Sequence, residues 1–209
     1  MSGAPTLGGV VLAGGRSTRM GRSKAHLPFG DETMLGRTVR LLGAAAAPIV
    51  VVGAPGQELP PLPGDVEVVR DAEEGRGPLA GIEAGLAALG DRCDAAFVCG
   101  CDTPLLRPEF VRRVAALLEG HDAAVPVVDD YLHPLGAVYR TTVLADVRAL
   151  LADDRRRPAF LFERVPTRRI AAAELEEADP DLRSLRNLNR PEDVAAALAA
   201  AGLGEDDAG

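Results

Sequence analysis

Residues 10–25 read VVLAGGRSTRMGRSKA, an apolar run that passes into two glycines and then into a loop rich in Arg and Lys. Glycines allow the backbone to turn sharply and to approach a ligand closely, so several N–H groups can point at one phosphate. Arg19 and Lys24 supply positive charge to the same loop. Two glycines alone would indicate only a surface turn with solvated cations. The whole string predicts a strand that ends in a phosphate-binding loop.

The spacing within this loop excludes two better-known phosphate loops. The sequence here has no G-x-G-x-x-G, and the intervals from Gly15 to Gly21 to Lys24 do not fit G-x-x-x-x-G-K-[ST]. The loop is therefore neither a dinucleotide-binding fingerprint nor a P-loop.

Short apolar runs and longer helical patterns alternate along the first part of the chain. The predicted helices cover residues 33–46, 78–89 and 108–118, and the predicted buried strands cover residues 9–12, 48–52, 66–69, 95–99 and 123–128. Apolar strands separated by helices are typical of a parallel sheet covered on both faces. The sequence therefore predicts an α/β fold, a Rossmann-like three-layer α/β/α sandwich around a mostly parallel central sheet.

The pattern after residue 128 is less regular. We expect a strand over 131–139, a helix over 141–151, a short helical piece near Phe160 and a strand over 165–170. A final helix over 191–201 and a disordered tail at 202–209 should follow. Asn189 is the expected N-cap of the final helix, and Glu192 and Asp193 suit its positive N-terminus. One domain spanning residues 1–201 accounts for these elements.

Composition narrows the class of protein. The chain has 209 residues and a formal net charge of −8, which argues against a general nucleic-acid binder because such proteins neutralise phosphates with Lys and Arg. No signal segment and no apolar stretch of roughly 18 residues is evident, so we expect a cytoplasmic protein that does not enter membranes. Three cysteines without a C-x-x-C pair give little support for disulfides or structural zinc, and Cys99 and Cys101 are expected to be buried.

Two carboxylates follow predicted strands. Asp102 comes after the 95–99 strand, so it should lie at the same sheet edge as Gly14. Magnesium is usually held by one or two carboxylates together with substrate phosphates, which makes Asp102 a candidate ligand. Asp71 follows the 66–69 strand and could accept a hydrogen bond from a ribose hydroxyl or a base amino group. Either residue could instead serve as a turn residue.

Several motifs together resemble one family. The strings LAGG at 12–15, RMG at 19–21 and KA at 24–25 are similar to the signature of molybdenum cofactor guanylyltransferases. Similar segments follow in the same order, namely GPLAGI at 77–82, CDTP at 101–104, HPL at 133–135, NLN at 187–189 and PED at 191–193. The resemblance spans residues from about 7 to 201.

The resemblance implies an activity and a set of site residues. Such enzymes transfer GMP from GTP to the terminal phosphate of molybdopterin, release pyrophosphate and require Mg²⁺, on the fold of nucleotide-diphospho-sugar transferases. The implied catalytic residues are Lys24, Arg19 and Asp102, of which Asp102 is the metal ligand. The implied nucleotide contacts are Leu12, Ala13, Gly14, Gly15, Lys24, Asp71 and Asp102, and the implied acceptor contacts are His133, Asn187 and Asn189.

One position departs from the family pattern. The family commonly has an Asn near the end of the second strand, in contact with guanosine, where this chain reads VGA at 52–54. The presence of two glycines in LAGG at 12–15 favours GTP, because cytidylyltransferase relatives usually carry T-A-A-G or L-A-A-G there. A related enzyme that uses CTP or another nucleotide with a pterin or sugar phosphate, and a nucleotide-binding domain without turnover, remain the alternatives.

The resemblance also divides the chain and suggests its partners. Residues up to about 128 form the expected nucleotide-binding half, and residues 129–201 the acceptor-binding half. GTP, molybdopterin and proteins that mature molybdoenzymes are the expected partners of a monomer or weak homo-oligomer. The arginines at 155–157 and 168–169 either receive the acidic acceptor or lie solvated on the surface.

Overall fold

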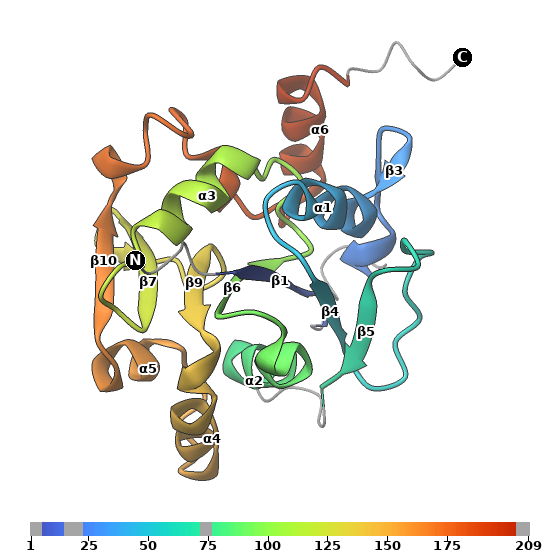
Figure 1. The fold of residues 1–209 in the computed structure, drawn as a ribbon. Helices are drawn as coiled ribbons and strands as arrows, with labels where there is room; N and C mark the ends of the chain where they lie inside the picture. Colours follow the sequence, from blue (N-terminus) through green and yellow to red (C-terminus); the bar gives the residue numbers. More distant parts are fainter. Residues whose placement is uncertain (1–5, 15–22, 72–76, 204–209) are drawn as a thin grey trace.

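A single sheet with its first strand near the centre dominates the computed structural model, which describes residues 6–14, 23–71 and 77–203. β1 (Leu7–Leu12) pairs in parallel with β4 (Ile49–Gly53) on one side and with β6 (Ala95–Gly100) on the other (Figure 1). All three strands therefore end at the same edge of the sheet.

The remaining strands extend this core in both directions, in the order β10-β7-β9-β6-β1-β4-β5 with β8 paired to β7. They are β5 (Glu67–Arg70), β7 (Ala123–Val128), β8 (Tyr131–Leu132), β9 (Ala137–Arg140) and β10 (Thr167–Ala171). β9 runs antiparallel between β6 and β7, and β8 is antiparallel to β7, whereas the other pairings in this sheet are parallel. A separate small sheet joins β2 (Pro28–Phe29) to β3 (Glu32–Thr33). The prediction of an α/β fold with a mostly parallel sheet is confirmed.

Helices cover both faces of the main sheet (Figure 1). The α-helices are α1 (Met34–Gly43), α2 (Pro78–Leu89), α3 (Pro108–Ala116), α4 (Leu144–Ala152), α5 (Ala159–Arg164) and α6 (Pro191–Ala200). The short 3-10 helices are η2 (Lys24–His26), η3 (Gly90–Arg92), η4 (Thr141–Val143), η5 (Ala172–Glu174) and η6 (Arg183–Leu185).

Two apolar layers follow from the alternation of side chains along the buried strands. Val11 and Phe97 pack with α1 and α3 in one layer, whereas Val10 and Val98 pack with α2, α4 and α5 in the other. A third, smaller cluster joins α6 to the β2–β3 hairpin through Phe29 and Ala197. The three-layer arrangement expected from the sequence is present.

The prediction for the 66–69 strand was wrong about burial. β5 is the last strand in the sheet order, and Val68 is 42% exposed. An edge strand has one side and much of its two faces open to water. Two of the four residues of β5, Glu67 and Arg70, are charged.

The predicted strand over 131–139 is divided in two. Asp129 and Asp130 both have positive φ values, 49° and 63°, and reverse the chain so that β8 pairs back on β7. β9 begins only at Ala137, after a segment that contains Pro134, which has no N–H to donate to a neighbouring strand.

The N-cap prediction for the final helix was wrong by one residue. The N-cap of α6 is Arg190, and the carboxylate of Asp193 accepts hydrogen bonds from the N–H groups of both Asn189 (3.0 Å) and Arg190 (2.8 Å). The side chain of Asn189 makes a different contact, described below. Of the predicted tail, Leu203 packs beside the Phe29 cluster, and residues 204–209 lie outside the described residues.

Cys99 and Cys101 are buried, as predicted. Burial raises the pKa of the Cys101 thiol to about 12 and raises that of Cys99 further, so both remain protonated within the apolar layer around Phe97. No helix in the part of the chain that the structure describes is long and apolar enough to cross a membrane.

The packing of Phe97 gives a test of this core. Its ring is fully buried in β6 and lies edge-on to that of Phe110 in α3, with centroids 6.4 Å apart. We predict that Phe97→Ala lowers the free energy of unfolding by about 3–5 kcal/mol, because it removes these contacts and leaves a cavity. Val68→Ala, on the exposed edge, should cost less than about 1 kcal/mol. Urea denaturation measures both, and equal losses would contradict the assignment of β6 to the core.

Candidate functional site

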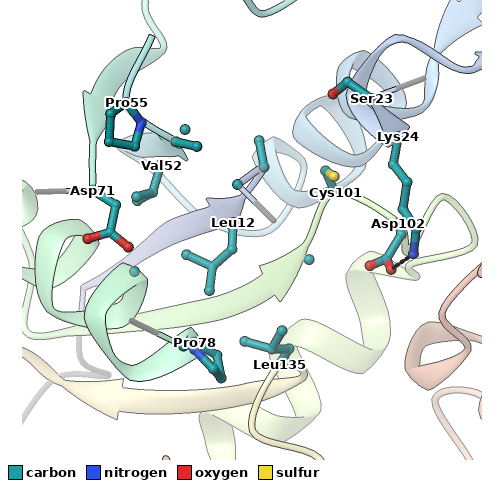
Figure 2. Close-up of a pocket in the computed structure, with 17 residues that line it drawn as sticks. Leu12, Ser23, Lys24, Val52, Pro55, Asp71, Pro78, Cys101, Asp102 and Leu135 are labelled. Carbon is teal, nitrogen blue, oxygen red and sulfur yellow. Dashed lines mark hydrogen bonds and ion pairs between the residues drawn. The ribbon is translucent and has the colours of Figure 1, made fainter. Parts of the chain in front are cut away.

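A cavity of about 580 Å³ lies where β1, β4 and β6 end. This is the edge at which parallel α/β sheets bind their ligands. The loops after these strands, the start of α2 and the segment before β9 form its walls (Figure 2). Its lining residues are Leu12, Ala13, Gly14, Ser23, Lys24, Val52, Gly53, Ala54, Pro55, Asp71, Gly77, Pro78, Gly81, Gly100, Cys101, Asp102 and Leu135.

The end of β1 forms part of the wall. Leu12 points into the cavity (Figure 2), and the N–H groups of Ala13 and Gly14 both donate to the carbonyl oxygen of Val52, at 2.8 and 3.2 Å. These two N–H groups therefore join β1 to β4. A Cβ on Gly14 would lie 3.2 Å from the backbone nitrogen of Ala54, so the close approach of the two strand ends favours glycine. Gly15 and Arg19 lie outside the described residues.

Lys24 and Asp102 form an ion pair at one end of the cavity (Figure 2). Lys24 Nζ donates to Asp102 Oδ2 at 2.7 Å and to Asn189 Oδ1 at 2.8 Å. The side chains of Lys24 and Asp102 are only 18% and 17% exposed, so water screens this pair less than a surface pair. Residues from the beginning, middle and end of the chain thus meet at one ammonium group.

The backbone fixes where Asp102 lies. Its side chain folds back over Gly100, where any Cβ would collide with the carboxylate. The buried hydroxyl of Thr103 donates to the carbonyl of Gly100 at 2.8 Å and closes the turn after β6. The carbonyl of Asp102 accepts from the N–H of Leu188 at 3.0 Å, which docks the 187–189 segment against this turn.

Asp71 lies at the other end of the cavity, near Pro55 and Val52 and away from the Lys24 pair (Figure 2). It directly follows β5, and its N–H donates to the carbonyl of Gly53 at 2.9 Å. The cavity therefore has a carboxylate at each end but an ammonium group at only one of them among the residues that line it.

The three candidate acceptor residues differ in where they lie relative to the cavity. His133 and Asn187 do not line the cavity, whereas Asn189 reaches Lys24. His133 is half-buried, and burial lowers the pKa of its imidazole. The HPL segment instead contributes Leu135 to the cavity wall, and the hydroxyl of Tyr139 anchors the segment by donating to the carbonyl of Pro134 at 2.8 Å.

Several of the arginines considered for an acidic ligand already have partners. Arg156 pairs with Asp154 at 2.6 Å, and Arg168 pairs with Glu174. The guanidinium of Arg155 lies over the ring of Phe160, with its Cζ 4.1 Å from the centroid. These contacts give each of the three a role on the protein surface.

Gln57 is a residue that the sequence reasoning missed. Its amide contacts Ala13, Ser23 and Ala54, all of which line the cavity, although Gln57 itself does not. It lies in a Pro-rich loop that carries no motif, so no local signal in the sequence indicated it.

The donor set at Asp102 fits a hard divalent cation. Among the residues that the structure describes, no group of three or more His, Cys, Asp or Glu side chains could hold a metal. Asp102 offers a carboxylate that already holds a cationic group, the ammonium of Lys24. Magnesium keeps several waters and needs only one or two carboxylates when substrate phosphates complete its coordination, so the site fits that ion.

Comparison with known proteins places the chain in a family. The model of the MobA-like NTP transferase domain matches residues 9–169. A relative from Mycobacterium bovis, named "Probable molybdenum cofactor guanylyltransferase", is 41% identical over 187 residues, which cover 88% of this chain and 89% of the relative.

Two solved structures share the fold. Molybdopterin-guanine dinucleotide biosynthesis protein A from Archaeoglobus fulgidus has a TM-score of 0.75 and 22% identity, with 93% of this chain and 98% of that one covered. A Mycobacterium tuberculosis protein in complex with manganese has a TM-score of 0.59 and 23% identity, with 80% and 88% covered. The family model and the 41% identical relative together show that the chain belongs to the MobA-like NTP transferase family.

Proposed function

We propose that this protein transfers GMP from GTP to the terminal phosphate of molybdopterin, releasing pyrophosphate and forming a guanine dinucleotide. The observation that carries the proposal is the Lys24–Asp102 pair at one end of a cavity that has Asp71 at its other end. The cavity of about 580 Å³ has room for a nucleotide, with phosphates beside Lys24 and the nucleoside beside Asp71. The name of the 41% identical relative supports the same activity.

The chemistry needs no general base. A phosphate monoester has a second pKa of about 6, so the acceptor is largely dianionic at neutral pH. One of its oxygens attacks the α-phosphorus of GTP, and the bond from that phosphorus to the bridging oxygen of the β-phosphate breaks. That electron pair leaves with pyrophosphate. The protein must therefore bring two anions together and stabilise charge on the departing group.

Lys24 is the described residue best suited to that task. Its ammonium lies at the end of the cavity, held by Asp102 and Asn189. Gly15 and Arg19, outside the described residues, are proposed to assist it, together with Leu12, Ala13 and Gly14 as nucleotide contacts. Asp102 would hold Mg²⁺, which supplies charge compensation and orientation to the phosphates. The manganese complex of the Mycobacterium tuberculosis neighbour supports a divalent cation in this fold.

The acceptor is proposed to bind on the side of the 129–201 half, within a single domain of residues 1–201. Asn189 supports this proposal because its side chain joins that half to Lys24. Asn187 is near it in sequence, and His133 precedes the segment that carries Leu135 into the cavity wall. Proteins that mature molybdoenzymes are the proposed recipients of the product.

Nucleotide preference tests the proposed function directly. Purified protein with Mg²⁺, molybdopterin and either GTP or CTP should release pyrophosphate with GTP at the higher kcat/KM. Preferred or equal use of CTP would favour the cytidylyl alternative. Absence of release with both nucleotides, together with nucleotide binding by calorimetry, would favour a binding domain without turnover.

The paired charges should be needed for turnover. We predict that Asp102→Asn abolishes metal-dependent activity, because a neutral amide is a much weaker ligand for Mg²⁺ than a carboxylate. Lys24→Ala should lower kcat on the order of 100-fold, because it removes positive charge next to the phosphates. Asp91→Asn is a matched control, since Asp91 is exposed in η3 before β6 and thus at the opposite sheet edge. Steady-state kinetics with GTP and Mg²⁺ measure all three, and near-normal turnover of Asp102→Asn would remove Asp102 from the mechanism.

Asn189 should act on the acceptor side. We predict that Asn189→Ala raises the KM for molybdopterin about tenfold, the effect of losing one hydrogen bond to a charged group. The KM for GTP should change much less. Glu192→Ala, at an exposed position in the first turn of α6, is the control. An equal rise in the KM for GTP would assign Asn189 to the nucleotide instead.

A further inference from the structure

Gly53 lies in the cavity wall where the family pattern commonly has an Asn, so this chain has no side chain at that position. The space beside it is nevertheless filled. A Cβ on Gly53 would collide with the guanidinium of Arg70, its partner in the β4–β5 register, and would lie 3.5 Å from Gln57 Oε1. The guanidinium of Arg70 thus occupies the place that a side chain at position 53 would take, and Gln57 lies in contact with that place.

Gln57 connects three separate pieces of the cavity wall. Its Oε1 accepts from the N–H of Ala54 at 2.8 Å, and its Nε2 donates to the carbonyl of Ala13 at 3.0 Å and to the hydroxyl of Ser23 at 3.2 Å. Ala13 follows β1, Ala54 follows β4, and Ser23 precedes Lys24 as the N-cap of η2. One side chain therefore fixes both strand ends relative to the helical turn that begins with Lys24.

The pattern of donors and acceptors requires an amide at this position. The oxygen must face an N–H group, and the nitrogen must face a carbonyl and a hydroxyl, so the reverse orientation of the amide would place like groups against each other. A carboxylate of the same length keeps the first contact but cannot donate to the carbonyl of Ala13. Glutamine satisfies all three contacts at once.

We propose that Gln57 is a positioning residue for nucleotide binding, which sets the distance between the wall around Gly53 and Ala54 and the ammonium of Lys24. This inference rests on the proposed function, because it concerns how the same cavity receives GTP. Gln57 does not line the cavity, so it acts through Ala13, Ala54 and Ser23.

The experiment compares Gln57→Glu and Gln57→Ala with the wild-type protein, in calorimetric titrations with GTP and Mg²⁺ and in pyrophosphate-release kinetics. Gln57→Glu should raise the Kd and KM for GTP about tenfold, since its carboxylate faces the carbonyl oxygen of Ala13. Gln57→Ala should raise both values less, because water can replace the missing amide. The kcat of each variant at saturating GTP should stay within about twofold of wild type, the signature of lost ground-state binding.

Thermal unfolding separates positioning from a structural role. Glu58→Gln, a change at the neighbouring exposed residue, is the control and should leave KM and Tm unchanged. A purely structural role of Gln57 would lower Tm in both variants without raising KM, and that result would overturn the inference. A fall in kcat at constant KM would overturn it as well.

The wild-type measurements keep the two proposals apart. If the wild-type protein binds GTP but both variants bind it equally well, the role of Gln57 is refuted and the proposed function stands. If the wild-type protein does not bind GTP, the proposed function fails, and the role of Gln57 fails with it.

Discussion

The hydrogen bonding of β1 on both sides, to β4 and to β6, is the constraint on which the rest of the molecule depends. Three parallel strands in register must end together, and the chain must cross back to the start of the sheet between them. It does so through α1 between β1 and β4, and through β5 and α2 between β4 and β6. The loops after them are therefore gathered at one edge. Lys24, Asp71 and Asp102, which are far apart in sequence, become the charged groups of one cavity.

At one end of that cavity the charges of Lys24 and Asp102 balance each other. Lys24 is held by the carboxylate of Asp102 and the amide oxygen of Asn189, so neither its ammonium nor the carboxylate is left uncompensated where both are mostly buried. A metal at Asp102 and phosphates at Lys24 would replace this pairing with two new ones.

Local patterns in the sequence were sufficient to predict the layers of the fold and the sheet edge at which Asp102 lies. The strand β1, Pro78 at the start of α2, and the position of Asp102 at the same sheet edge as Gly14 all follow from periodicity and from strand ends that share an edge. Sequence patterns did not predict the roles of side chains whose partners are distant in the sequence. The Asn189 side chain contacts Lys24, 165 residues away, rather than capping a helix, and Gln57 acts through hydrogen bonds that no spacing rule contains.

The position of β9 between β6 and β7 also affects how the chain folds while it is being synthesised. β6 ends at Gly100, but its antiparallel neighbour ends at Arg140, so about 40 further residues must be synthesised before that side of β6 is covered. At translation rates of roughly 5–20 residues per second, the apolar segment AAFVCG has an unpaired edge for about 2–8 seconds. During that interval the nascent protein offers a template for strand pairing with other chains, and this is the stage at which a chaperone on the ribosome would protect it.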